Sequence, residues 1–332
     1  MSELIRLGHG GGGRLTDELI RDIFLEAWGN PYLNKLDDSA RLKLNQTNIA
    51  FTTDSYVVTP VFFNGGDIGK LAVCGTVNDL SVMGAKPLWI SVGIILEEGF
   101  SIPNLKKIVA SMKLASEEAG ISIVTGDTKV VSKSDGIFIN TSGIGEIIWS
   151  HPGVEKIEPG DRIIINGTLG DHSAAVLSAR GQFELHTDIP SDAAPLNDLI
   201  FSLENWKDHI KFMRDITRGG LGGVLSEITE KSDWGIKVFE KEVPVLDAVR
   251  GLTELLGYDP LLMANEGKAA FIVSEEAAEA ICHKLKTHPY GKNSAIIGTV
   301  TKEYPGKVLL ETEFGGTRIL EKPLGEDLPR IC

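Results

Sequence analysis

Along the first half of the chain, two kinds of hydrophobic pattern alternate. Four stretches are rich in Val, Ile, Phe and Thr, the composition typical of β-strands, at residues 49–58, 89–96, 121–125 and 137–148. Between them, residues 67–83 and 104–119 carry apolar side chains at helical spacing, and Gly84 and Gly120 are placed to end these helices. The pattern predicts an α/β domain in which strands and helices alternate.

A shift in composition divides the chain near residues 151–161, where prolines and glycines are concentrated. Beyond it, strands are expected at 162–166, 236–239, 269–273, 295–300 and 307–311, with helices ending near 180, beginning near 220, and at 245–256 and 275–286. We therefore expect a glycine-rich segment with a helix ending near Trp28 (1–35), an N-terminal domain (36–153), a C-terminal α/β domain (154–320) and a mobile tail (321–332).

Length and composition agree with two domains, because 332 residues with 42% hydrophobic content can form two cores. The net charge of -13, with no concentration of Lys and Arg, disfavours a nucleic-acid partner. The longest apolar run, 88–96, is too short to span a membrane, and no basic-then-apolar leader opens the chain. We expect a cytoplasmic protein without a membrane partner.

Three cysteines are too widely spaced for a disulfide framework or a zinc site: Cys74, Cys282 and Cys332. The first two fall within predicted helices, where buried thiols are expected. Cys332 is the last residue, and an extended tail over 322–332 reaches roughly 35 Å at about 3.3 Å per residue. The tail can be a carrier arm that brings a reactive thiol to a cleft, or a disordered end with an accidental cysteine.

Four aspartates lie near the ends of predicted elements or within a predicted helix: Asp38, Asp54, Asp79 and Asp127. Asp79 interrupts an otherwise apolar helical face made by residues 68, 72, 75 and 82. A buried carboxylate needs a cation or a hydrogen-bond donor, and several converging carboxylates are typical of a magnesium-phosphate site. The alternative, a helix cap or turn former, suits Asp127 well, because it follows Gly126.

Three further segments are candidates for binding or catalysis. Gly10, Gly11, Gly12 and Gly13 precede a helix, and their free amides can cradle a phosphate unless the N-terminus is mobile. Residues 215–223 combine an acid, a hydroxyl, a guanidinium and glycine amides, which suits either anion binding or tight packing. In residues 265–268, Glu266 is either a positioned general base or part of a hairpin turn.

Together these segments resemble the PurM-like superfamily of ATP-using enzymes that includes aminoimidazole ribotide synthetase, selenophosphate synthetase and thiamine monophosphate kinase. The resemblance covers most of the chain, through residues 38–39, 54, 77–85, 125–128 and 215–220. The opening 8–14 and the ending 329–332 are similar to those of the HypE family of hydrogenase maturation factors. The resemblance implies an α/β (α+β) fold of two PurM-like domains, an N-terminal mixed sheet with helices that forms a homodimer, and ATP bound in a cleft formed with that dimer.

The resemblance also implies a reaction and its partners. The carbamoyltransferase HypF places a carbamoyl group on the terminal thiol, and HypE proteins use ATP to dehydrate the thiocarbamate to a thiocyanate. The cyano group passes to the HypC–HypD complex, which builds the iron ligands of nickel-iron hydrogenase. Phosphoryl transfer from ATP to the amide oxygen turns the loss of oxide into the loss of phosphate.

By matching motif, the resemblance assigns roles to the candidate residues. Cys332 is the reactive thiol, Arg330 helps to dock the tail, and Lys129 is a cation near the phosphates. Glu266 is the candidate base, with His9 as a second candidate. Mg²⁺ is expected to be held by some of Asp38, Asp54, Asp79 and Asp127.

Two alternatives stay open at this point. One is a kinase or synthetase of the same superfamily that acts on a free small molecule and does not use its tail. The other is a non-catalytic metal-delivery scaffold whose terminal thiol binds nickel or iron. The seven histidines are dispersed and no soft-ligand cluster accompanies Cys332, which weakens the second alternative.

Overall fold

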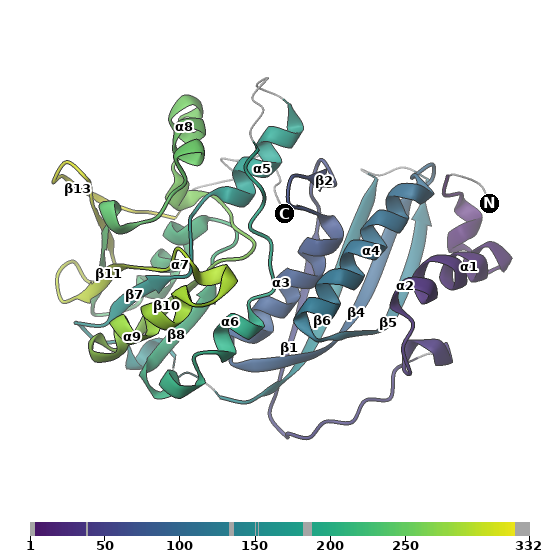
Figure 1. The fold of residues 1–332 in the computed structure, drawn as a ribbon, viewed down its shortest axis with the longest axis horizontal. Helices are drawn as coiled ribbons and strands as arrows, with labels where there is room; N and C mark the ends of the chain where they lie inside the picture. Colours follow the sequence, from purple (N-terminus) through teal and green to yellow (C-terminus); the bar gives the residue numbers. More distant parts are fainter. Residues whose placement is uncertain are drawn as a thin grey trace.

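Two α/β domains lie beside each other along the long axis of the molecule (Figure 1). The computed structural model describes residues 4–37, 39–132, 136–149, 151, 153–181 and 188–322. The expectations for Asp38, Arg330 and Cys332 therefore lie outside the described residues. No helix in the described ranges has the length and apolar character that crossing a membrane requires.

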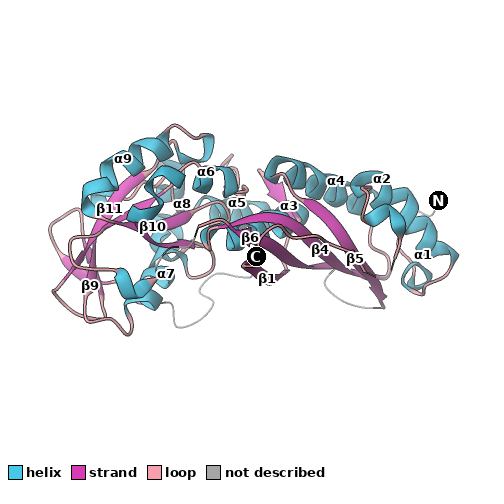
Figure 2. Ribbon diagram, turned by 90° about the horizontal axis from the view of Figure 1, so that it is seen from below, coloured by secondary structure: helices cyan, strands magenta, loops and turns pink. Residues whose placement is uncertain are grey.

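The N-terminal domain is built on a four-stranded mixed sheet, as predicted. Its strands are β1 (Ile49–Tyr56), β4 (Ala85–Glu97), β5 (Ser122–Val131) and β6 (Ile137–Ile147), in the order β1-β6-β4-β5. Only the β4–β5 pair in this sheet is parallel. Helices α3 (Ile68–Val82) and α4 (Ile102–Ala119) cover one face, and no described helix covers the other (Figure 2).

Local signals set the ends of these two helices. The Asp67 carboxylate caps α3 by accepting hydrogen bonds from the Gly69 and Lys70 amides at 2.7 and 3.1 Å. Gly84 and Gly120 adopt φ of 71° and 67° just after α3 and α4, the left-handed conformation that glycine accepts without strain. The predicted helix ends are confirmed to within two residues. A short hairpin of β2 (Phe62–Phe63) and β3 (Gly66–Asp67) leads into α3.

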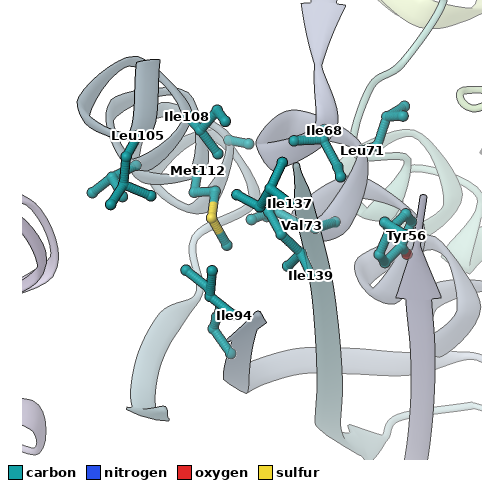
Figure 3. Packing of buried hydrophobic residues seen from close by; sticks show 14 of the residues in the cluster. Tyr56, Ile68, Leu71, Val73, Ile94, Leu105, Ile108, Met112, Ile137 and Ile139 are labelled. Atoms are coloured by element: carbon teal, nitrogen blue, oxygen red, sulfur yellow. The ribbon is translucent and has the colours of Figure 1, made fainter. Parts of the chain in front are cut away.

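Helix α3 is buried on nearly all sides. Its outer face packs against the second domain, and its inner face packs with α4 onto the sheet. Figure 3 shows the side chains that meet there, from α3, α4, β4 and β6: Ile68, Leu71, Val73, Leu105, Ile108, Met112, Ile94, Ile137 and Ile139. Cys74 is fully buried, as predicted. Because α3 packs both onto its own sheet and against the second domain, its polar residues lie at the junction between the two domains.

The C-terminal domain contains a seven-stranded sheet in the order β13-β12-β9-β11-β7-β10-β8. The strands are β7 (Arg162–Ile165), β8 (Ile210–Asp215), β9 (Gly235–Phe239), β10 (Ala269–Val273), β11 (Ala295–Thr301), β12 (Val308–Glu311) and β13 (Thr317–Ile319). Its helices are α5 (Asp171–Arg180), α6 (Asn197–Phe201), α7 (Gly220–Thr229), α8 (Asp247–Leu256) and α9 (Glu275–Lys286). Sequence patterns did not predict β8, β13 or α6.

The N-terminal segment forms one irregular helical region against the edge of the first sheet. It comprises α1 (Arg14–Leu19), a π-helical turn (Ile20–Leu25) and α2 (Glu26–Trp28), so the predicted end near Trp28 is confirmed. Short 3₁₀ turns occur at Leu7–Gly10, Leu33–Lys35, Val154–Lys156, Glu204–His209, Glu240–Glu242, Pro260–Leu262 and Pro289–Gly291. Two expectations are wrong in detail: β5 continues to Val131, so Asp127 lies inside a strand rather than in a turn, and Asp54 lies within β1.

Candidate functional site

A cavity of about 560 Å³ lies at the junction of the two domains. Strand β1 and the C-terminal half of α3 form one side, and the end of β8 with the loop after it forms the other. Its charged lining residues are Asp54, Asp79, Arg214, Asp215, Arg218 and Glu266. Three residues that the sequence singled out, Asp54, Asp79 and Glu266, therefore line one cavity.

Asp79 leaves the buried surface of α3 and points into this cavity. Thr52 Oγ1 on β1 donates a hydrogen bond of 2.8 Å to Asp79 Oδ2. Partial burial raises the pKa of Asp79; the Thr52 hydrogen bond lowers it, the charge of Asp54 raises it and that of Arg214 lowers it. The partner that a carboxylate in this apolar face needs is thus the hydroxyl group of Thr52, with the guanidinium of Arg214 nearby.

Asp215 was predicted as the acid of the anion-binding segment 215–223, but not as a possible metal ligand. It ends β8, directly before the glycine-rich segment, and desolvation raises its pKa to about 7, with further contributions from the charges of Asp79 and Asp54. The available signal was its position at the start of the motif 215–220. Three carboxylates thus repel one another at one end of the cavity, an arrangement that a divalent cation stabilises.

These carboxylates do not complete a metal site within one chain. In the described part of the chain, no three His, Cys, Asp or Glu side chains lie close enough to hold a metal ion by themselves. The oxygen donors still suit Mg²⁺, which keeps several water molecules and binds through one or two carboxylates together with substrate phosphates. Asp54, Asp79 and Asp215 are the residues that can hold it in this cavity.

Glu266 is only 3% exposed and is held in a buried loop, not in an exposed hairpin turn. Its amide donates a hydrogen bond of 3.0 Å to Asp192 Oδ1. Its carbonyl oxygen accepts one of 3.2 Å from Asn78 Nδ2 on α3. Asn78 also had no predicted role, although it lies next to Asp79 in the motif over 77–85.

A second cavity, of about 320 Å³, lies between the N-terminal segment and β5. Gly10, Gly12, Asp127 and Lys129 line its polar part, and Phe24, Trp28 and Tyr32 are among its apolar lining residues. Lys129 Nζ lies 2.9 Å from Asp127 Oδ1, and this hydrogen-bonded ion pair lowers the pKa of Asp127. Both side chains are largely exposed, so the pair is open to a ligand.

The glycine-rich segment lies against this cavity, and only some of its residues line it. His9 is 4% exposed, and the Arg6 amide donates a hydrogen bond of 2.9 Å to its Nδ1. Gly10 packs against β5, because a Cβ there would lie 2.5 Å from the Val130 nitrogen. Gly11 and Gly13 do not line the cavity. The segment is therefore packed onto the sheet, and His9 is buried beside the cavity.

The candidate residues thus fall into two groups in one chain. The domain junction holds Asp54, Asp79 and Glu266. The second cavity, at the opposite edge of the first sheet, holds Gly10, Gly12, Asp127 and Lys129. A magnesium site that also includes Asp127 or Asp38 stays a prediction.

Comparison with protein families places the fold. Residues 36–147 match the family model "AIR synthase related protein, N-terminal domain", and residues 158–311 match "AIR synthase related protein, C-terminal domain". The chain is therefore a two-domain protein of the AIR synthase-related class, which confirms the predicted fold class.

Relatives narrow the class to one family. The chain is 46% identical to the carbamoyl dehydratase HypE of Escherichia coli K12, over 99% of both chains. A crystal structure of the hydrogenase maturation protein HypE in complex with ATP has a TM-score of 0.93 and 46% identity, covering 98% of this chain and 99% of that one. A HypE–HypF complex matches with a TM-score of 0.79 and 48% identity, over 92% and 99%. The chain belongs to the HypE family of carbamoyl dehydratases, which act in hydrogenase maturation, and the predicted resemblance is confirmed.

Proposed function

We propose that this protein dehydrates an S-carbamoyl group on its own Cys332 to S-cyanocysteine at the expense of ATP, and so supplies the cyanide ligands of the iron in nickel-iron hydrogenase. The observation that carries the proposal is Glu266, a buried carboxylate in the same cavity as Asp54, Asp79 and Asp215, in a chain 46% identical to a carbamoyl dehydratase. The ATP complex of a relative supports ATP as the co-substrate.

The proposed reaction removes one oxygen and two nitrogen-bound protons from the thiocarbamate. The amide oxygen attacks the γ-phosphorus of ATP, and the bond from that phosphorus to the ADP oxygen breaks. A base then takes a nitrogen proton while the carbon–oxygen bond breaks, phosphate leaves and the nitrile forms. The other nitrogen proton leaves earlier, when the oxygen is phosphorylated, and passes to solvent, so that a neutral imidate phosphate is the species that loses phosphate. ADP, phosphate and a thiocyanate are the products.

Glu266 is our candidate for the base, because it lines the junction cavity together with the carboxylates that can hold Mg²⁺. His9 is the second candidate. Its Nδ1 accepts a hydrogen bond of 2.9 Å from the Arg6 amide, and its ring is buried beside the second cavity.

Mg²⁺ is the second proposed cofactor. When bound, it neutralises the triphosphate and the charge that develops during phosphoryl transfer. Asp54, Asp79 and Asp215 are our described ligands, with Asp38 and Asp127 as further candidates. Arg214 and Arg218 line the same cavity and can contact phosphate oxygens from its other side.

We further propose a homodimer formed through the uncovered face of the first sheet. Phe51 on β1 is 66% exposed, and Ile95 on β4 is 43% exposed. Phe51 pairs with Ile144 across the β1–β6 register, so both side chains lie on this face. An apolar sheet face normally requires a covering layer, and a second copy of the chain provides one. Both cavities border this sheet, which fits ATP binding in a cleft formed with the dimer.

The proposed partners follow the same family. A HypE–HypF complex of a relative supports HypF as the donor of the carbamoyl group. The HypC–HypD complex as the cyanide acceptor, and the cytoplasm as the location, stay predictions.

The test separates the two steps that use ATP. The chain is first carbamoylated by HypF with carbamoyl phosphate and Mg-ATP, then freed of nucleotide, and ATP is added back in a chase. Intact mass and peptide mapping should show a carbamoyl group on Cys332 and the loss of one water only after the chase. An unmodified Cys332 in the presence of active HypF would instead favour a small-molecule kinase or synthetase of the same superfamily. Cys332→Ser is the matched control.

A further inference from the structure

A buried group of charges lies behind Glu266 and outside both cavities. Lys268 Nζ is 3.0 Å from Asp192 Oδ2 and 3.8 Å from Asp171 Oδ2. The three side chains, Lys268, Asp192 and Asp171, are 10%, 4% and 8% exposed. Two carboxylates thus share one ammonium group in the interior. Buried ion pairs are weak contributors to stability, because desolvation offsets the attraction, so this arrangement calls for another explanation.

The two oxygens of Asp192 have separate partners. Oδ2 faces Lys268, and Oδ1 accepts the hydrogen bond of 3.0 Å from the amide of Glu266. Lys268 therefore fixes the carboxylate that in turn fixes the backbone of the candidate base. The charged partner also strengthens the hydrogen bond, since an ionised acceptor binds an amide more strongly than a neutral one.

The carbonyl of Glu266 is held from the other domain. Asn78 Nδ2 donates to the Glu266 carbonyl at 3.2 Å and to the Ala194 carbonyl at 3.1 Å. Asn78 Oδ1 accepts from the Leu196 amide at 2.7 Å. Asn78 is 2% exposed, and its side chain uses both its donors and its acceptor in these hydrogen bonds.

Steric contact leaves little freedom to the same loop. A Cβ on Gly267 would lie 2.0 Å from the Asp192 carbonyl oxygen and 3.2 Å from the Ala194 nitrogen. Asn166 then holds the next residues, since its Nδ2 donates to the Gly267 carbonyl at 3.1 Å and its Oδ1 accepts from the Ala269 amide at 2.7 Å. The chain is thus fixed on both sides of Glu266.

We infer that Asn78, Asp192 and Lys268, here named the Glu266 clamp, are positioning residues that set the location of the Glu266 carboxylate in the junction cavity. Asn78 contacts the Glu266 loop, and the next residue in α3 is Asp79, one of the carboxylates that can hold Mg²⁺. The clamp therefore connects the position of the base to that of the proposed metal site. The inference rests on the proposed function, because it takes Glu266 as a reacting group. The clamp acts through Glu266 and does not touch the substrate.

The test compares Asp192→Ala with Asp192→Asn in the full-length protein. Three quantities are measured: the single-turnover rate of water loss from carbamoylated Cys332, ATP binding, and the thermal midpoint. Asp192→Ala removes the acceptor and should slow water loss by about tenfold or more, with ATP affinity unchanged, since small displacements of a reacting group cost rate. Asp192→Asn keeps a side-chain oxygen for the Glu266 amide and should restore most of the rate.

A purely structural role predicts another outcome. The inference is overturned if Asp192→Ala keeps the wild-type rate, if Asp192→Asn is as slow as Asp192→Ala, or if ATP affinity falls as much as the rate. The double variant Asp192→Ala with Glu266→Gln should be no slower than Glu266→Gln alone, and additive losses would contradict action through Glu266. Failure of the wild-type chain to lose water at all would instead reject the proposed function.

A second pair of variants applies if Asp192→Ala does not fold. Lys268→Met leaves the Asp192 acceptor in place but removes the cation that orients it, so the same step should slow by roughly threefold to tenfold. Lys268→Arg keeps the cation and should recover the rate. An unchanged rate in Lys268→Met, or no recovery in Lys268→Arg, would contradict the inference.

Discussion

The junction cavity and the second cavity beside β5 are built in opposite ways. At the domain junction, Glu266 is buried and its backbone is held by Asp192 and Asn78, so its position is fixed without a ligand. In the second cavity, Lys129 and Asp127 are exposed and contact mainly each other. The difference indicates that the loop carrying Glu266 is pre-organised, and we expect the second cavity to be one wall of a binding site that a ligand or a second copy of the chain completes.

The largest effect on stability is expected from a substitution in the Glu266 loop, Gly267→Ala, compared with one in the glycine-rich N-terminal segment, Gly13→Ala. Gly267→Ala places a Cβ 2.0 Å from the Asp192 carbonyl oxygen, so the loop must move, and we expect a loss of about 3 kcal/mol in the free energy of unfolding. Gly13→Ala meets no atom within 4 Å and should change it by less than about 0.5 kcal/mol. Chemical denaturation measures both, and equal effects would show that the junction loop is not tightly held.

The uncovered sheet face offers the next test. Phe51→Asp would place a carboxylate in the proposed dimer contact, and we expect a monomer in sedimentation velocity together with weaker ATP binding. Phe314, 98% exposed at residues 312–316 between β12 and β13, provides the matched control, because Phe314→Asp should leave the oligomeric state unchanged. A Phe51→Asp protein that stays dimeric would move the interface elsewhere.

Asp215 should make the stability of the domain junction depend on pH. Its folded pKa of about 7 lies above the ordinary value of 3.8, so its contribution to stability is fully present below pH 3.8 and is lost as pH rises through 7. Asp215→Asn should therefore stabilise the metal-free protein at pH 8, by on the order of 1 to 2 kcal/mol, and have less effect at pH 5.

Magnesium sharpens the same test. Mg²⁺ favours the ionised carboxylate and should raise the thermal midpoint of the wild type more at pH 8 than at pH 5. Asp215→Asn should lose most of this response. A response that is the same in both proteins would remove Asp215 from the list of magnesium ligands.

The smallest stability effect is expected at the cysteines. Burial raises the pKa of the Cys74 and Cys282 thiols, so brief iodoacetamide treatment of the native protein should label Cys332 alone. Cys332→Ala should shift the free energy of unfolding by less than about 0.5 kcal/mol while abolishing the modification. A large loss of thermal stability would argue against a carrier arm.

Sequence patterns predicted the elements whose signals are local. Helix α3 was found within one residue at each end because Asp67 caps it and Gly84 ends it. The second half of β5 was missed because polar residues such as Asp127 and Lys129 lie on an exposed part of the strand, where apolar alternation fades. Strand β8 was missed for a similar reason, since only part of it is buried.

The same limit applies to the site. Asp79 was recognisable because a carboxylate in an apolar helical face needs a partner. Asp192 gave no such signal, because its role depends on a contact with Glu266, 74 residues away. Asn78 stood beside Asp79 in a motif already noted, and a polar residue in a helix that is buried on nearly all sides was the available signal.

In the proposed reaction, the chain's own terminal thiocarbamate is dehydrated in the junction cavity with Glu266 as the base. The most direct measurement is the mass of the C-terminal peptide after an ATP chase of carbamoylated, nucleotide-free protein, compared between the wild type and Glu266→Gln. We predict that the wild type loses one water from Cys332 and that Glu266→Gln binds ATP but stays carbamoylated, slower by about 10² to 10⁴-fold. Equal water loss in both proteins would contradict the role of Glu266 as the base.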